Sequence, residues 1–111
     1  ETSTMKTTVK IFAGACLALT LGAGAAAAAD VKVAIKDYAF APAAVTIHAG
    51  DTVTWTNEDQ MVHTVTFKDG GASSGGLAGG ATFSRTFKAG GNFAYVCSLH
   101  PQMRATVTVL P

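Results

Sequence analysis

The sequence predicts an all-β protein, a two-sheet Greek-key β-sandwich of about seven or eight strands. Apolar and polar residues alternate with period two over several short runs, which is the pattern of strands with one buried face. Glycine-containing turn sequences separate these runs. No helical periodicity follows residue 29, and about seven short strands in about 80 residues fit two packed sheets.

The first expected strand is residues 31–36, where Val31, Val33 and Ile35 alternate with Lys32, Ala34 and Lys36. Similar alternation, or a β-branched and aromatic run, predicts strands at residues 45–48, 52–56, 62–67, 83–87, 92–97 and 104–109. Turns are expected at Ala49-Gly50-Asp51, Asp69-Gly70-Gly71 and Ala89-Gly90-Gly91. The Gly/Ser-rich stretch 70–80 lacks the Gly-Lys-Ser/Thr ending of a phosphate-binding loop and predicts a flexible connection.

The first 29 residues predict an export signal. Residues 1–4 are interpreted as left over from cloning, and residues 5–29 combine a start at Met5, two early lysines and a charge-free Ala/Gly-rich stretch. Small residues at −3 and −1 place cleavage between Ala29 and Asp30, which leaves residues 30–111 as the domain exported to the periplasm. The alternatives are an uncleaved membrane anchor, or a lipid anchor on Cys16.

The charge of the mature domain excludes some partners. Residues 30–111 contain six Lys or Arg and six Asp or Glu, so the net charge is zero with His neutral. A neutral domain without a basic patch is not expected to bind nucleic acid or a membrane surface. We expect a monomer. A domain of this size can form one modest core, and a bound metal would stabilise it further.

Cysteine usage points to a metal site. Cys16 leaves with the signal, so Cys97 is the single cysteine of the mature domain and no intramolecular disulfide is possible. A lone thiol in an oxidising compartment is expected to be buried or bound to a metal.

The candidate ligands are Cys97, His100 and Met103, spaced Cys-x2-His-x2-Met where a strand enters a loop, with His63 added from a neighbouring strand. Thiolate and thioether are soft donors, and imidazole suits both oxidation states of copper, so the set favours one copper ion cycling between Cu(I) and Cu(II). Zinc would accept Cys and His but gains nothing from Met. Taken singly, each of these residues could be a buried core side chain, but together they are better explained as a copper site.

Other chemistry-bearing residues have simpler interpretations. His48 precedes a turn and is expected to face solvent, and Trp55 is expected in the core. Glu58 and Asp59 are interpreted as a solvated turn and not as an acid–base pair. The sequence shows no nucleophile triad, so we do not expect an enzyme.

The mature region resembles the cupredoxins, and most of all the amicyanin branch of the plastocyanin-like family. Three stretches carry the resemblance: residues 38–47, residues 49–63 and residues 95–103, the last with a short Cys–His–Met loop and Pro101 after His100. The resemblance implies that His63, Cys97 and His100 are strong copper ligands and that Met103 is a weak axial one. Thr64 stands where many members have Asn, which leaves open how the two ligand loops are tied together.

The resemblance also implies a blue-copper one-electron carrier that docks transiently with a donor and an acceptor, for example a dehydrogenase or a c-type cytochrome. We expect an apolar patch around the edge of His100, made by Leu99, Pro101, Met61 and Leu77. The alternative is a periplasmic copper chaperone or storage protein, which would use the same four ligands. A binuclear copper centre would need a second cysteine, which the mature domain lacks.

Overall fold

The computed structural model describes residues 27–111 of the 111-residue chain. The expected cloning remnant and nearly all of the expected signal, including Cys16, lie outside the described residues. Within residues 27–111, no helix has the length and apolar character needed to cross a membrane.

Over residues 27–111 the fold is all-β, as predicted, with eight strands in two sheets. The strands are β1 (Asp30–Lys36), β2 (Ala39–Ala41), β3 (Ala44–His48), β4 (Thr52–Asn57), β5 (Thr66–Phe67), β6 (Thr82–Thr86), β7 (Gly91–Cys97) and β8 (His100–Leu110).

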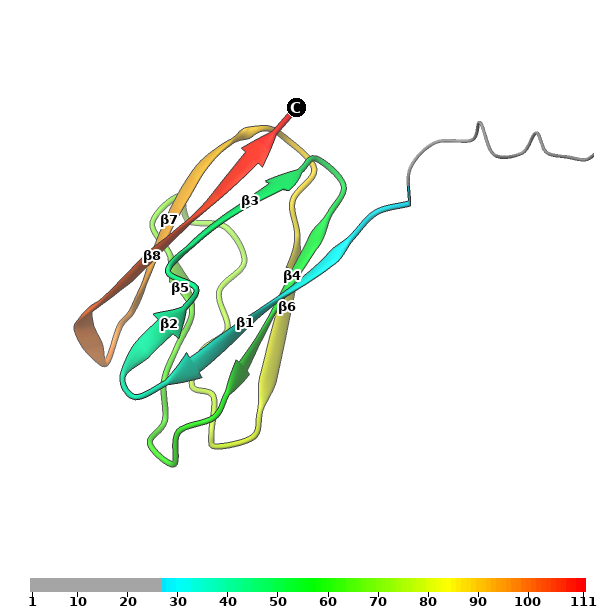
Figure 1. Cartoon of the computed structure of the whole chain (residues 1–111). Helices are drawn as coiled ribbons and strands as arrows, with labels where there is room; N and C mark the ends of the chain where they lie inside the picture. Colours follow the sequence, from blue (N-terminus) through cyan, green and yellow to red (C-terminus); the bar gives the residue numbers. More distant parts are fainter. Residues whose placement is uncertain (1–26) are drawn as a thin grey trace, which may run out of the picture.

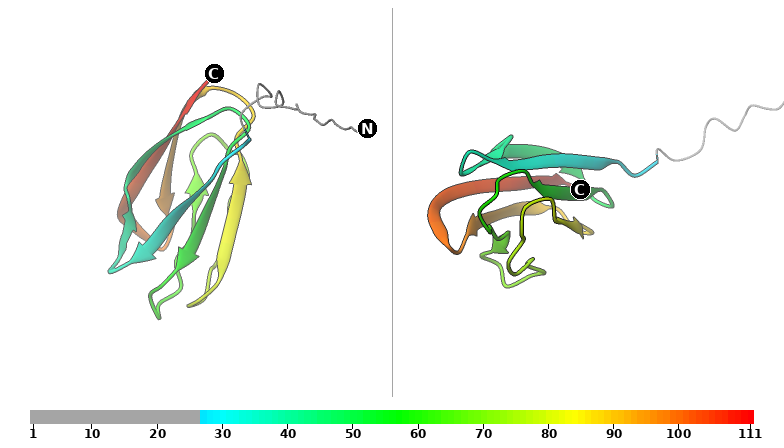
Figure 2. Two further views of the ribbon diagram at one scale, coloured as in Figure 1. Left: turned by 45° about the vertical axis from the view of Figure 1, so that its right-hand side comes forward. Right: turned by 90° about the horizontal axis from the view of Figure 1, so that it is seen from below.

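Each sheet has four strands. One has the order β2-β1-β4-β6 and the other the order β3-β8-β7-β5. Figure 2 shows β1, β4 and β6 side by side in cyan, green and yellow. Two pairs, β1 with β4 and β3 with β8, are parallel, and the remaining pairs are antiparallel. The parallel pairs join strands that are not linked by hairpins, which is how a Greek-key sandwich differs from a simple meander.

The core between the sheets follows from the period-two patterns. In β4 every second residue is buried, and Trp55 is fully buried, as expected. Its Nε1 donates to the hydroxyl of Tyr95, 3.0 Å away on β7, so this indole N–H is satisfied inside the core. Burial raises the pKa of Tyr95 to about 12, which keeps its hydroxyl neutral.

The expected strand 62–67 is mostly wrong. Only Thr66 and Phe67 pair as a strand, and His63 forms an isolated bridge with Leu77. The amides between them donate to side chains, because Thr64 N reaches the sulfur of Cys97 and Val65 N reaches the hydroxyl of Ser74. These side-chain acceptors take the place of a strand ladder.

Three further differences concern the connections and the strand bounds. The Gly/Ser-rich stretch is hydrogen-bonded along residues 63–65, through Ser74 and Leu77, and is not a free connection. The last strand begins at His100 and not at Arg104, so only Ser98 and Leu99 separate β7 from β8. β2, which has three residues, was not expected because it is too short to show alternation.

Candidate metal centre

Three connections meet at one end of the sandwich. They are the β1–β2 turn, the segment after β4 and the β7–β8 hairpin, and all three lie at the lower end in Figure 1. The segment after β4 contributes His63, and the hairpin contributes Cys97 and His100. The short hairpin fits this role because β7 ends at Cys97 and β8 starts at His100, which leaves two residues to make the turn.

The three side chains converge on one point. The Sγ of Cys97 lies 3.7 Å from Nδ1 of His63 and 3.7 Å from Nδ1 of His100. All three donor atoms lie within 4.8 Å of one another. Cys97 and His63 have no solvent-exposed surface, and His100 is partly exposed. The site is therefore closed on the protein side and reaches solvent at the ring of His100.

The environment of Cys97 favours a thiolate. Burial by itself raises the pKa of this thiol, but hydrogen bonds outweigh it and lower the pKa to about 6. The contacts that lower it are, in order of size, the amide of Thr64, the rings of His100 and His63, and the amide of Leu99. Since the thiolate is the form that binds metal, the site is prepared for a metal ion before one arrives.

Met103 lies on β8, three residues after His100. It is 2% exposed, so its thioether belongs to the interior of the sandwich at the same end as the other three side chains. Cys-x2-His-x2-Met thus corresponds to a strand end, a two-residue turn and the first buried position of the next strand.

Thr64 ties the two ligand-bearing segments together. Its hydroxyl accepts a hydrogen bond from the amide of Ser98 at 2.8 Å, and its own amide donates to the sulfur of Cys97 at 3.3 Å. The hydroxyl also lies 3.1 Å from that of Ser98. This answers the question left open by the missing Asn, because a threonine at this position joins the segment of His63 to the β7–β8 turn.

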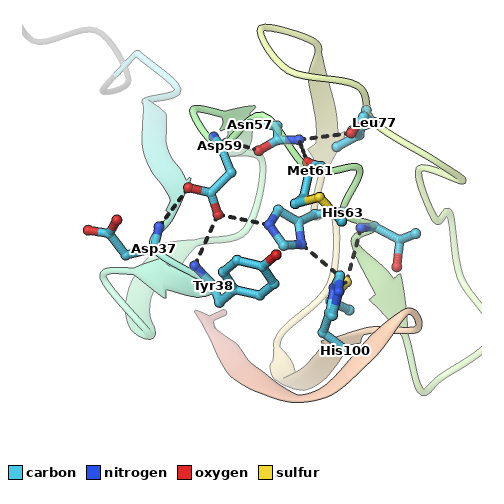
Figure 3. A network of polar contacts seen from close by, with 10 residues as sticks. Asp37, Tyr38, Asn57, Asp59, Met61, His63, Leu77 and His100 are labelled. Atoms are coloured by element: carbon cyan, nitrogen blue, oxygen red, sulfur yellow. Dashed lines mark hydrogen bonds and ion pairs between the residues drawn. The ribbon is translucent and has the colours of Figure 1, made fainter.

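Asp59 is the functional residue that the sequence interpretation missed. Its Oδ2 accepts from Nε2 of His63 at 2.8 Å, while Nδ1 of the same ring faces Cys97 (Figure 3). A carboxylate on the far nitrogen of a ligating histidine fixes the ring orientation and tautomer. The signal in the sequence was an acid four residues before the histidine. The sequence alone does not show that the backbone of residues 57–63 turns so that the carboxylate of Asp59 meets the ring of His63.

The same carboxylate holds the β1–β2 turn. The amides of Asp37 and Tyr38 donate to its two oxygens at 2.8 and 3.0 Å. Both residues have positive φ, 54° and 58°, as in the two-residue turns that close β-hairpins. The Tyr38 amide is the main cause that lowers the pKa of Asp59, followed among the lowering causes by the Asp37 amide and His63. Asp59 is thus held as a carboxylate between the turn and the imidazole.

The turn places Tyr38 on the two histidines. Its ring meets those of His63 and His100 edge-on, with centroids 5.1 and 4.9 Å apart (Figure 3). Asn57 supports the loop below, because its Nδ2 donates to the carbonyls of Met61 and Leu77. The imidazoles are therefore fixed by carboxylate, aromatic and backbone contacts, and they have little freedom to move.

Comparison with known proteins shows the family to which the chain belongs. A family model described as the cupredoxin-like domain matches residues 9–109. The chain belongs to the cupredoxin family. Like other cupredoxins it carries one copper ion as its cofactor.

Relatives of this cupredoxin include amicyanins and plastocyanins. It is 36% identical over 89 residues to amicyanin-alpha of Methylorubrum extorquens, covering 76% of this chain and 75% of that protein. It is 34% identical over 83 residues to plastocyanin of Scenedesmus fuscus, covering 63% and 85% of the two chains. The solved structure of amicyanin from Paracoccus versutus superposes with a TM-score of 0.67 at 34% identity, covering 72% of this chain and 80% of that one.

The spacing of the donor atoms fits a copper ion. Metal–nitrogen bonds of about 2.0 Å and metal–sulfur bonds of about 2.3 Å, opened to about 110–120°, separate the two donor atoms by about 3.5–3.7 Å. The observed separations from Cys97 to the two histidines are 3.7 Å. One buried thiolate and two imidazoles, with a thioether nearby in the chain, is the donor set that copper accepts in both oxidation states.

The surface around His100 is apolar, with one change from the expected patch. Leu99 and Met61 are 55% and 51% exposed, and Pro101 is exposed. Leu77 was expected there but is buried, because its backbone bridges His63 and its side chain joins the core. Tyr38 and Val62, which were not expected, are exposed at this end. His48 is exposed on β3 and takes no part in the centre.

Proposed function

We propose that this cupredoxin is a type 1 copper protein that carries single electrons between periplasmic redox partners, and that its copper ligands are His63, Cys97, His100 and, at the axial position, Met103. The observation that carries the proposal is the convergence of one buried sulfur and two imidazole nitrogens within 4.8 Å. Bound copper supplies a Cu(II)/Cu(I) couple that accepts and releases one electron.

The chain's own residues supply a fixed geometry. Thr64 joins the two ligand segments, and Asp59 fixes the ring of His63, so the donor atoms cannot follow the different preferences of the two oxidation states. Little rearrangement on electron transfer means a low barrier. His100 is the partly exposed ligand, so its edge is the route by which an electron reaches a docked partner.

The apolar surface supports transient docking. Leu99 and Pro101 flank His100 in the chain, Met61 is exposed in the segment after β4 at the same end, and residues 30–111 have zero net charge. Small apolar contacts without strong charge suit brief encounters of low buried area. The partners we propose are a dehydrogenase as donor and a c-type cytochrome as acceptor, with the carrier acting as a monomer and not as an enzyme.

The deciding experiment is the addition of Cu(II) to the purified protein. We expect an intense blue band from charge transfer between the Cys97 thiolate and copper, and its complete loss in Cys97→Ser. A pale or colourless adduct of the unaltered protein would exclude a type 1 site.

A second measurement separates a carrier from a copper chaperone or store. A carrier should show a reversible Cu(II)/Cu(I) couple at an electrode and keep its copper in both states. Ready loss of Cu(I) to a competing chelator would favour the chaperone.

A further inference from the structure

A second well-organised polar site lies at the opposite end of the sandwich from Cys97, at the upper end in Figure 1. Asp51, in the turn between β3 and β4, is only 8% exposed. Its Oδ1 accepts from the amide of Ala29 at 2.8 Å, and its Oδ2 accepts from the amide of His48 at 2.9 Å. The two hydrogen bonds lower the pKa of Asp51, and the one from Ala29 has the larger effect. Asp51 is therefore a carboxylate that both amide donors stabilise.

Ala29 is part of the folded domain. Its carbonyl accepts from the amide of Thr52 at 2.9 Å, next to the parallel pairing of Asp30 with Thr52. With its amide on Asp51 and its carbonyl on Thr52, Ala29 extends the contact of β1 with β4 by one residue. Its side chain, like those of Ala27 and Ala28, is exposed and only a methyl group.

The rule for signal cleavage does not distinguish the neighbouring bonds of this alanine run. Cleavage after Ala27, after Ala28 or after Ala29 places alanines at both −3 and −1. The products differ. Cleavage after Ala29 removes both hydrogen bonds of that residue and leaves Oδ1 of Asp51 without the amide, whereas cleavage after Ala28 keeps both partners in place.

We infer that the export signal is cut at the Ala28–Ala29 bond, so that the mature chain begins at Ala29 and its α-ammonium pairs with Asp51. In this step a membrane-bound signal peptidase adds water across the peptide bond. Ala28 leaves with the new carboxylate, and the nitrogen of Ala29 takes up a proton and becomes an ammonium. That nitrogen already lies 2.8 Å from a carboxylate oxygen, so processing converts a neutral hydrogen bond into an ion pair.

The ion pair has a structural consequence. Chain termini fray unless they are tied down. Here the charged terminus is anchored to the β3–β4 turn, which is itself fixed because the amide of Phe87 donates to the carbonyl of Asp51. A cut at the Ala28–Ala29 bond therefore places the charged terminus directly on Asp51, which a cut at another bond of the alanine run does not do.

The position of the cut can be read from a mass. The full chain is exported in a bacterial host, and the periplasmic product is analysed by intact mass spectrometry and N-terminal sequencing. We expect a chain that starts at Ala29. A product starting at Asp30, or at any other residue, would overturn the inference, and this readout needs no variant that must fold.

The ion pair is tested with two chains of equal copper content, one beginning at Ala29 and one at Ala27. In the longer chain the Ala29 amide still donates to Asp51, but the ammonium lies two residues away. We expect a higher urea midpoint for the shorter chain.

Asp51→Asn provides the matched control, because in both chains it removes the negative charge and one of the two acceptor oxygens. It should lower the midpoint more in the chain beginning at Ala29, and it should abolish the difference between the two chains. Equal midpoints for the two unaltered chains would refute the ion pair.

Discussion

At the scale of single residues, two polar side chains control how the ligands are held. Asp59 accepts from Nε2 of His63 and from the amides of the β1–β2 turn, and Thr64 accepts from the amide of Ser98. Neither provides a donor atom to the proposed copper. They act by fixing the side chains and the turn that do, so their substitutions should change tuning and stability in different ways.

We expect Asp59→Asn to raise the reduction potential of the copper centre. A carboxylate on Nε2 makes the imidazole of His63 a better donor and favours the more highly charged Cu(II). Losing such a partner typically costs about 10–100-fold in metal affinity. A tenfold loss confined to Cu(II) corresponds to about 59 mV for one electron. Cyclic voltammetry measures the shift, and the exposed neighbour Glu58→Gln is the control, since it removes the same charge. Equal shifts in the two variants would mean that the bond to His63 has no role.

Thr64→Val should destabilise the fold and leave the blue colour. The variant keeps the shape and the main-chain bond to Cys97, but it leaves the amide of Ser98 without its acceptor. Because this hydrogen bond is only partly buried, its loss costs about 0.5–1.5 kcal/mol. Urea denaturation of Thr64→Val and of Thr64→Ser, which retains the hydroxyl, measures the difference. If both variants lose the same stability, the loss comes from the methyl group and not from the hydrogen bond.

At the scale of elements, the sequence predicts the strands that alternate and fails where side chains replace the backbone ladder. Strands such as β1 and β4 bury every second residue, so their pattern is visible in the residues alone. Residues 62–67 contain β-branched and aromatic residues, but Ser73, Ser74 and Cys97 accept their amides. No local pattern reveals an acceptor that lies six or more residues away along the chain.

The same contrast holds for the metal site. The spacing of Cys97, His100 and Met103 is local, so the sequence predicts this part of the ligand set and, with His63, the choice of copper. Asp59 and Tyr38 reach the site through the β1–β2 turn, whose two positive φ values are not suggested by an Asp-Tyr pair. The sequence therefore predicts the proposed ligands, but it does not predict that Asp59 and Tyr38 contact them.

The side chain of Arg85, on β6, packs against the 69–71 turn. Its guanidinium lies over Phe67 and Phe87, at 4.4 and 4.6 Å, and its Nη2 contacts Asp69 at 3.1 Å. Its Nη1 is buried and finds no hydrogen-bond acceptor among the described residues, so the aromatic faces are its surroundings. A Cβ on Gly71 would lie 2.5 Å from Nη2 of this side chain.

We expect Gly71→Ala to destabilise the protein by displacing Arg85 from this position. The added methyl group forces the guanidinium to shift, and because this is the end of a flexible side chain, weakening of its stacking and of the Asp69 contact costs about 0.5–1 kcal/mol. Chemical denaturation of Gly71→Ala, in the unaltered chain and in Arg85→Met, tests the cause. The penalty should be much smaller in the Arg85→Met background. A penalty of the same size in both would point to the backbone of the turn instead.

At the scale of the whole molecule, the two ends of the sandwich serve different purposes. One end gathers the proposed ligands under an apolar surface, and the other holds the β3–β4 turn at Ala29. The sheets between them are fixed by the buried Trp55–Tyr95 pair. A rigid frame allows the surface at the copper end to be changed without altering the ligand geometry beneath it.

We expect Leu99→Glu to slow electron exchange with a protein partner about tenfold while leaving the blue band unchanged. Leu99 is 55% exposed beside His100 and belongs to no core contact, so a charge there disturbs docking and not the ligands. Stopped-flow oxidation of the reduced protein by a c-type cytochrome measures the rate. Oxidation by hexacyanoferrate, which needs no apolar contact, should change much less.

Leu110→Glu is the matched control, because Leu110 is exposed at the far end of β8 and a charge there should have little effect. If both variants slow the cytochrome reaction equally, net charge and not the apolar patch governs docking; if Leu99→Glu bleaches the protein, the residue supports the copper site itself.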